Sequence, residues 1–217
     1  IKKVLKSNFL TSGPTVEIFE RNIKNYLNSK YALSCSSGTS ALFMAFNAID
    51  LKKNDVVVCP IINFVATTNL LSLFNAKIIF VDINEKTGAI DVAKVEKILK
   101  KKGIKKVKAV VNMHIGGVPN DIEKFYKLKK KYNFLLIEDS CHSFGSTYNM
   151  NKKNYKIGSC NHADISTFSF HPLKTITTCE GGALTTNNKI FYEKSKLFRS
   201  HGIIRNKNNH YRYDVNQ

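Results

Sequence analysis

Short apolar segments alternate with longer amphipathic segments along most of this chain. Apolar runs of about five residues between turn formers are typical of buried strands. Apolar residues three and four positions apart are typical of helices. Because the crossover between two parallel strands usually contains a helix, this alternation predicts an α/β fold with a mostly parallel sheet. We expect helices on both faces of that sheet, in a three-layer arrangement.

Turn formers and helical spacing place the expected elements along one domain. Ser12-Gly13-Pro14-Thr15 interrupts the chain before the first long helix, and Pro60 is expected to stop the second strand. The expected strands cover 31–34, 55–59, 77–81, 107–111, 134–137, 164–169 and 182–185. The expected helices cover 18–27, 39–49, 64–74 and 119–128, and a last one begins near 189. No internal repeat or low-complexity linker divides the chain.

The composition favours a soluble, reduced protein. No apolar run approaches the roughly 20 residues of a membrane-spanning helix, so we expect no membrane insertion. The five Cys are an odd number without a C-x-x-C pair, which is typical of free thiols in the cytoplasm. Cys141-His142 and Cys160-x-His162 could in principle hold a metal. Residues adjacent on a strand point to opposite faces, however, so we expect neither a metal site nor a Cys141–His142 nucleophile and base pair.

The net charge of +18 leaves a nucleic-acid-binding module as the non-enzyme alternative. The basic residues are 30 Lys and only 4 Arg, whereas sites that read bases or clamp phosphates favour the planar guanidinium of Arg. The lysines are spread over expected helices and loops, with runs at 100–102 and 129–131. A solvated, Lys-rich surface explains this pattern, so we expect no specific nucleic-acid partner.

The first segment that carries chemistry is Ser36-Ser37-Gly38-Thr39-Ser40-Ala41-Leu42, at an expected strand–turn–helix junction. Small residues there allow backbone N–H groups to approach an anion, and the helix N-terminus favours negative charge. The hydroxyls of Thr39 and Ser40 could add hydrogen bonds. A plain helix cap explains the same residues equally well.

The second segment is Leu135-Leu136-Ile137-Glu138-Asp139-Ser140-Cys141-His142. It places an acidic residue at the carboxyl end of a buried strand, which is where α/β sheets bind their ligands. A carboxylate at this position can keep a pyridine nitrogen protonated, so that the ring becomes an electron sink. Asp139 could instead cap a helix.

The third segment is Ser166-Thr167-Phe168-Ser169-Phe170-His171-Pro172-Leu173-Lys174, followed by Glu180-Gly181-Gly182-Ala183. Most lysines of the chain lie in polar runs, whereas Lys174 lies between Leu173 and Thr175-Ile176-Thr177-Thr178. Imine chemistry requires a lysine whose amine can lose its proton, and partial burial favours that. The alternative is an ordinary surface lysine.

Together these segments resemble the DegT–DnrJ–StrS family of pyridoxal 5′-phosphate (PLP) dependent sugar aminotransferases. The resemblance runs along essentially the whole chain. Its motifs are Leu10-Thr11-Ser12-Gly13-Pro14, Ser37-Gly38-Thr39-Ser40-Ala41-Leu42, Asn63-Phe64-Val65-Ala66-Thr67-Thr68-Asn69, Glu138-Asp139-Ser140-Cys141-His142, Ser169-Phe170-His171-Pro172-Leu173-Lys174, Glu180-Gly181-Gly182 and Arg199-Ser200-His201-Gly202. Within the family, the chain is most similar to PseC-type enzymes, which aminate C4 of a UDP-linked 4-keto-6-deoxy amino sugar. The segments that carry this closer match are Phe64-Val65-Ala66-Thr67, Ser169-Phe170-His171, Ile176-Thr177-Thr178 and Phe198-Arg199-Ser200-His201-Gly202.

The resemblance implies roles for four residues around the cofactor ring. Lys174 would hold PLP as a Schiff base and then carry a proton between the amino donor and the cofactor. Asp139 would pair with the pyridinium nitrogen. Phe64 would stack on one face of the ring, and His142 would lie near its phenolic oxygen. Lys174 also argues against the sugar dehydratase branch of the family, which has His at that position.

The resemblance also implies a phosphate site and a substrate site. Gly38, Thr39 and Ser169 would bind the phosphate of PLP. Leu10 and Thr11 would face the sugar nucleotide.

For the whole protein, the resemblance implies a fold-type-I PLP-dependent transferase. Residues 1–217 would form its PLP-binding large domain, a fragment without the short N-terminal segment, the downstream Asn/Arg motif and the small C-terminal domain of the family. We expect a cytoplasmic homodimer that transfers an amino group from glutamate to a nucleotide-linked 4-keto-6-deoxy sugar, for pseudaminic acid or other surface-glycan synthesis. A family member acting on a different keto sugar, at C3 or elsewhere, and a PLP-binding regulator remain open.

Overall fold

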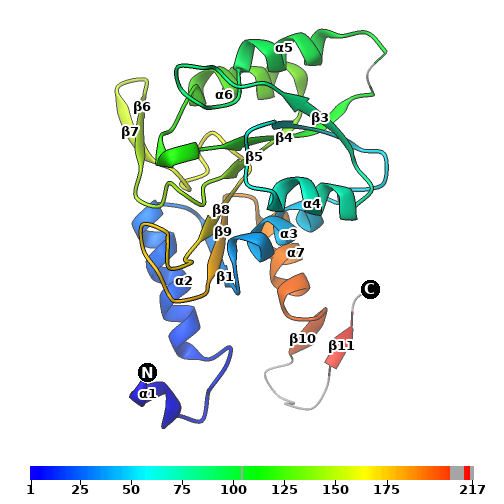
Figure 1. Cartoon of the computed structure of the whole chain (residues 1–217). Helices are drawn as coiled ribbons and strands as arrows, with labels where there is room; N and C mark the ends of the chain where they lie inside the picture. The colour runs from blue at the N-terminus through cyan, green and yellow to red at the C-terminus, as the bar shows by residue number, and fades with distance from the viewer. Residues whose placement is uncertain (104, 206–212, 216–217) are drawn as a thin grey trace.

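A seven-stranded sheet forms the centre of the fold (Figure 1). The computed structural model describes residues 1–103, 105–205 and 213–215. The strand order is β1-β9-β8-β5-β4-β2-β3. Its strands are β1 (Tyr31–Cys35), β2 (Val56–Pro60), β3 (Lys77–Val81), β4 (Val107–Met113), β5 (Leu135–Asp139), β8 (Ile165–Ser169) and β9 (Gly182–Thr186). The pairs β3–β2, β2–β4, β4–β5 and β5–β8 are parallel, so the expected mostly parallel sheet is confirmed.

Helices cover both faces of this sheet, as expected. The helices are α1 (Lys2–Leu5), α2 (Pro14–Leu27), α3 (Gly38–Ala48), α4 (Ala66–Leu73), α5 (Val92–Lys100), α6 (Ile122–Tyr132) and α7 (Lys189–Arg199), with a short 3-10 helix η1 (Ile115–Gly117). On one face, α3, α4 and α7 pack against odd-numbered sheet residues such as Val57 and Ile137. On the other, α5 and α6 pack against Val58 and Leu136, and α2 packs against Phe168. No helix among the described residues is long and apolar enough to cross a membrane.

Some elements differ from the expectation. The helix α5 was missed, although Asp91 caps it by accepting the N–H groups of Ala93 and Lys94 at 2.8 and 3.2 Å. The hairpin of β6 (Thr147–Met150) and β7 (Lys153–Lys156) was also missed, because its strands are short and polar. The strands β10 (Ile203–Arg205) and β11 (Tyr213–Val215), also not expected, pair with each other in antiparallel orientation.

Two expectations about strands were incomplete. Pro60 is the last residue of β2 rather than the first residue after it. Its missing N–H removes no hydrogen bond between β2 and β4, because the pairing of these strands stops at Val58. The strand β9 runs antiparallel to both of its neighbours, β1 and β8. Apolar patterning does not encode that direction.

A polar clamp fixes α2 and α7 to the edge strand β1. Oε1 of Glu20 accepts hydrogen bonds from the backbone N–H and the hydroxyl of Ser34, both at 2.8 Å. Arg199 donates to the same carboxylate oxygen and, at 3.0 Å, to the carbonyl of Ser34. The carboxylate is largely shielded from water, so its loss would leave several donors without an acceptor.

We expect Glu20→Ala to lower the free energy of unfolding by about 2 kcal/mol, because a half-buried guanidinium and a backbone N–H lose a charged acceptor. Urea denaturation followed by circular dichroism measures this change. Glu123→Ala serves as the control, since it removes an exposed helix pair with Lys127 and should leave the midpoint almost unchanged. Equal midpoints for the two variants would contradict the clamp.

Candidate active site

The N-terminus of α3 has the features of an anion site. Ser37 caps the helix by accepting the N–H of Ser40 at 3.0 Å. Among the hydrogen bonds of the described residues, the N–H groups of Gly38 and Thr39 have no acceptor. Two free N–H groups at the start of an 11-residue helix bind negative charge favourably. The cap and the anion site are therefore compatible, since Ser37 satisfies a different donor.

Two glycines let three segments meet at this helix terminus. A Cβ atom on Gly38 would lie 2.8 Å from Sγ of Cys141 and 2.9 Å from Cβ of Ser169. A Cβ atom on Gly182 would lie 2.2 Å from the carbonyl oxygen of Ser37. Only glycine allows these approaches without moving backbone. The close packing places Ser169, at the end of β8, directly beside the free N–H groups of α3.

Asp139 ends β5 on the same face of the sheet as α3. Its side chain is only 2 % exposed, and Oδ1 accepts the N–H of Cys141 at 3.2 Å. No helix starts here, so Asp139 caps a turn rather than a helix. None of the ion pairs among the described residues involves this carboxylate. A buried carboxylate without a cation is costly, which favours a positively charged ligand group beside it.

Lys174 lies half-buried in the turn after β8, where its N–H donates to the carbonyl of His171 at 2.9 Å. Its charge reaches two residues of the turn after β5. Burial is the main cause that raises the pKa of the Cys141 thiol, with Asp139 adding to the rise and Lys174 opposing it. The pKa of His142 is lowered mainly by burial and further by the charge of Lys174, whereas the charge of Asp139 acts in the opposite direction. Lys174, Asp139, Cys141 and His142 therefore share one electrostatic environment.

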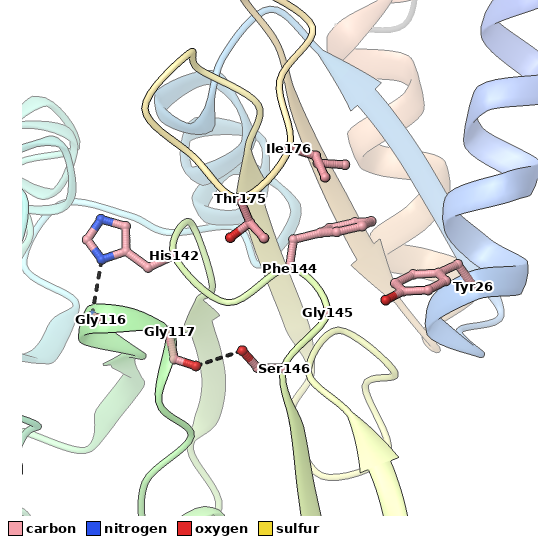
Figure 2. Close-up of a pocket in the computed structure, with 9 residues that line it drawn as sticks. All are labelled: Tyr26, Gly116, Gly117, His142, Phe144, Gly145, Ser146, Thr175 and Ile176. Carbon is pink, nitrogen blue, oxygen red and sulfur yellow. Dashed lines mark hydrogen bonds between the residues drawn. The ribbon is translucent and has the colours of Figure 1, made fainter.

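A cavity of about 680 Å³ opens beside this group (Figure 2). Its walls come from α2, η1, the turn after β5 and the turn that carries Lys174. The lining residues are Tyr26, Gly116, Gly117, His142, Phe144, Gly145, Ser146, Thr175 and Ile176. The sequence patterns did not indicate Tyr26 or Gly116-Gly117, although a Gly-Gly pair three residues after the end of a buried strand was an available signal.

Tyr26 closes one side of the cavity. Its ring stacks on Phe144 with centroids 5.4 Å apart, and Nζ of Lys156 lies 3.6 Å from its centroid. No sequence signal connects this α2 residue to the rest, since 90 residues separate it from Gly116.

No hydrogen bond, ion pair or aromatic pair among the described residues joins the remaining expected side chains to this group. Thr39 is exposed beside Gly38, and Phe64 is 63 % exposed just before α4. Leu10 and Thr11 are exposed between α1 and α2. The roles expected for Phe64, Leu10 and Thr11 stay predictions.

The argument that placed Cys141 and His142 on a strand was wrong about the element. β5 ends at Asp139, and both residues lie in the turn that follows, where strand alternation does not apply.

Cys160 is fully buried, and burial raises the pKa of its thiol to about 12. No group of three or more His, Cys, Asp or Glu residues in the described part of the chain could hold a metal ion.

A sequence model of the DegT/DnrJ/EryC1/StrS aminotransferase family matches residues 1–216. The chain belongs to this family. The UDP-4-amino-4,6-dideoxy-N-acetyl-beta-L-altrosamine transaminase of Campylobacter jejuni subsp. jejuni serotype O:23/36 (strain 81-176) is 41% identical over 205 residues, which are 94% of this chain and 52% of that protein.

Two solved structures have the same fold. PseC of Helicobacter pylori, described as an aminotransferase involved in the biosynthesis of pseudoaminic acid, superposes with a TM-score of 0.87 at 34% identity, covering 100% of this chain and 55% of that chain. NtdA of Bacillus subtilis, solved with bound cofactor PMP, gives a TM-score of 0.81 at 32% identity, covering 93% and 43%. The expected fold-type-I architecture is confirmed. The chain spans about half the length of the relatives it matches.

The DegT/DnrJ/EryC1/StrS aminotransferases use PLP, which agrees with the cofactor expected from the sequence. The geometry fits this group. The free N–H groups of Gly38 and Thr39 suit a phosphate, the unpaired carboxylate of Asp139 suits a pyridinium nitrogen, and the half-buried amine of Lys174 suits a Schiff base.

We expect Gly182→Ala to weaken PLP binding at least about tenfold, because its methyl group would push the Ser37 carbonyl and the adjoining N–H groups away from Ser169. Titration of PLP followed by visible absorbance measures the affinity. Gly103→Ala is the control, since a Cβ atom at Gly103 would meet nothing within 4 Å, although its φ of 84° makes that substitution the more strained of the two in backbone conformation. Equal affinities in the two variants would show that the close approach at Gly182 does not shape the anion site.

Proposed function

We propose that this chain forms the PLP-binding large domain of a transaminase that moves an amino group from glutamate to a nucleotide-linked 4-keto-6-deoxy sugar. The observation that carries the proposal is the convergence, at one edge of the sheet, of Lys174, Asp139 and the free N–H groups of Gly38 and Thr39. These groups come from α3, β5 and the turn after β8, which are far apart in the sequence.

Each group has a distinct task in such a reaction. PLP, when bound, supplies an electron sink for the bond that breaks at the donor's α-carbon. The amine of Lys174 binds the cofactor and carries the proton that leaves that carbon. The carboxylate of Asp139 holds a proton on the pyridine nitrogen. The N–H groups of Gly38 and Thr39, with the hydroxyl of Ser169, bind the phosphate, and Phe64 covers one ring face.

The substrate class rests on the relatives and on the cavity. Relatives named for UDP-linked or pseudoaminic-acid-related amino sugars support a nucleotide-linked sugar as the acceptor. The cavity beside Lys174 is of a size that ligand pockets commonly have. Its aromatic wall of Tyr26 and Phe144 suits the apolar face of a sugar ring. Leu10 and Thr11 would face the nucleotide. Glutamate is the donor that the family resemblance implies.

A homodimer is part of the proposal. Exposed apolar side chains occur on the segment after β2 and on the turn after β8, beside the proposed site. They are Ile61, Ile62, Phe64, Val65, Leu173 and Ile176. A second copy of the chain covering these residues would remove apolar surface from water at the mouth of the site.

We expect the intact protein to show the visible absorbance of bound PLP and Lys174→Ala to lose it. Borohydride reduction followed by peptide mapping should place the pyridoxyl group on Lys174. Lys189→Ala is the control, because Lys189 is an exposed lysine at the start of α7. A pyridoxyl group on any other lysine would end the assignment.

We expect the intact protein to aminate a UDP-linked 4-keto-6-deoxy sugar with glutamate. A panel of nucleotide-linked keto sugars, including 3-keto sugars, tests the substrate class by product mass and regiochemistry. Turnover of none of them would reject the class, and amination only at C3 would reject the regiochemistry.

The same assay distinguishes a chemical role of the Asp139 carboxylate from a purely structural one. Asp139→Asn keeps an oxygen that can accept the N–H of Cys141, so the turn and PLP binding should survive. Turnover should fall by roughly a hundredfold or more, because the ring nitrogen loses its charged partner. Near-normal turnover in this variant would mean that Asp139 serves only the turn.

A further inference from the structure

A row of buried polar side chains crosses the sheet on the face that α2, α5 and α6 cover. Asn112 of β4 is paired with Glu138 of β5, and Glu138 is paired with Ser166 of β8. Ser166 is in turn paired with Thr185 of β9. All four residues are at most 3% exposed, and the surrounding side chains under these helices form apolar clusters. Polar groups are costly in an apolar core, so the row points to a role other than packing.

Glu138 is the centre of this row, because both of its carboxylate oxygens have a neighbour. The hydroxyl of Ser166 donates to Oε2 at 2.5 Å. Nε2 of His114 lies 3.4 Å from Oε1, which is an ion-pair distance without the alignment of a hydrogen bond. Glu138 therefore links β5 to the neighbouring strand β8 and to the residue that follows β4.

His114 connects this carboxylate to Asp139, whose side chain lies on the opposite face of the sheet. The ring of His114 contacts Glu138, and its backbone N–H donates to the carbonyl of Asp139 at 3.1 Å. The side chain of His114 is 0% exposed, so it is enclosed by protein on all sides. A second hydrogen bond, from the N–H of Cys141 to Oδ1 at 3.2 Å, holds the carboxylate of Asp139. The amides of His114 and Cys141 are therefore direct probes of where Asp139 lies.

We propose that Glu138 is a positioning residue for Asp139, which it holds in place through its contacts with Ser166 and His114 on the other face of the sheet. The inference rests on the proposed function, in which Asp139 is the partner of the ring nitrogen of PLP. Adjacent residues of a strand point to opposite faces, so a rotation of the β5 backbone that displaces one of the two acids displaces the other. A charged partner acts on a ligand most strongly when its direction is fixed before the ligand binds.

Amide hydrogen exchange, followed by NMR in protein without added cofactor, tests whether the contacts of Glu138 hold Asp139. Ser166→Ala removes the hydroxyl that donates to Glu138. We expect the amides of His114 and Cys141 to exchange about tenfold faster in this variant, relative to amides of β2, because both donate to Asp139.

Ser195→Ala is the matched control for this measurement. Ser195 is also 0% exposed, but its hydroxyl has no hydrogen-bond partner among the described residues. It should leave the amides of His114 and Cys141 as well protected as in the wild type. Equal exchange in the two serine variants, or an equal rise that includes the amides of β2, would overturn the proposal. Failure to bind PLP would count against the proposed function alone, because this measurement needs no cofactor.

Turnover of the PLP-loaded protein tests whether Glu138 acts through Asp139. We expect Glu138→Leu to lower kcat about tenfold with little change in the KM of the nucleotide-linked sugar. Glu138→Gln should stay within about threefold of the wild type, because its amide can still accept from Ser166 and contact His114. In the Asp139→Asn background, Glu138→Leu should cause no further loss, since residues that act as a unit are not additive.

Two results of this assay would contradict the proposal. Equal losses in Glu138→Leu and Glu138→Gln would refute the two contacts as the cause. The same tenfold loss with Asp139 and with Asn at that position would refute action through Asp139. If Glu138→Leu does not fold, Ser166→Ala takes its place, with a loss of about threefold expected beside Asp139 and none in the Asp139→Asn background.

Discussion

The close approach of α3 to the ends of β8 and β9 is the constraint on which the rest of the site depends. Gly38 and Gly182 allow it, since a side chain on either would collide with Ser169, Cys141 or the Ser37 carbonyl. Without this approach the free N–H groups of α3 would face solvent rather than the strand that leads to Lys174. The close packing of these segments therefore brings the N-terminus of α3, the hydroxyl of Ser169 and the turn that carries Lys174 close together.

Strand alternation then gives the adjacent acids Glu138 and Asp139 different surroundings. Asp139 shares its face with Ile137 and α3, where it has no ion-pair partner among the described residues. Glu138 shares the other face with Leu136, where it contacts His114 and Ser166. A buried carboxylate needs compensation, and among the described residues Glu138 has two side-chain neighbours that can supply it, whereas Asp139 accepts only the backbone N–H of Cys141. Asp139 is thus available for a cationic ligand. The segment from Asp139 to His142 is also hydrogen-bonded at both ends to the turn after β4, through the N–H groups of His114 and Gly116.

Local patterns predicted much of this arrangement. The apolar strand before Glu138-Asp139 indicated a buried strand with an acid at its carboxyl end, and the small residues around Gly38 indicated a helix N-terminus near an anion. The antiparallel direction of β9 could not be read, because a strand buried on both faces has the same apolar run in either direction. The wall supplied by Tyr26 and the Gly116 contact to His142 depend on tertiary packing between distant segments. The roles of Phe64, Leu10 and Thr11 rest on resemblance, since no hydrogen bond, ion pair or aromatic pair among the described residues connects them to Lys174.

The lysine-rich surface makes the surroundings of Lys174 more informative than its residue type. Lys94, Lys129 and Lys131 each pair with a carboxylate, at 2.7, 2.8 and 3.0 Å. Lys174 takes part in none of the ion pairs among the described residues and is half-buried. A carboxylate partner would favour the ammonium form, so surroundings without one suit the imine role that we propose for Lys174. The distributed charge of +18 has a separate consequence, because it favours the approach of phosphorylated ligands in general and does not distinguish one from another. Discrimination among such ligands would have to come from specific groups such as those at the sheet edge.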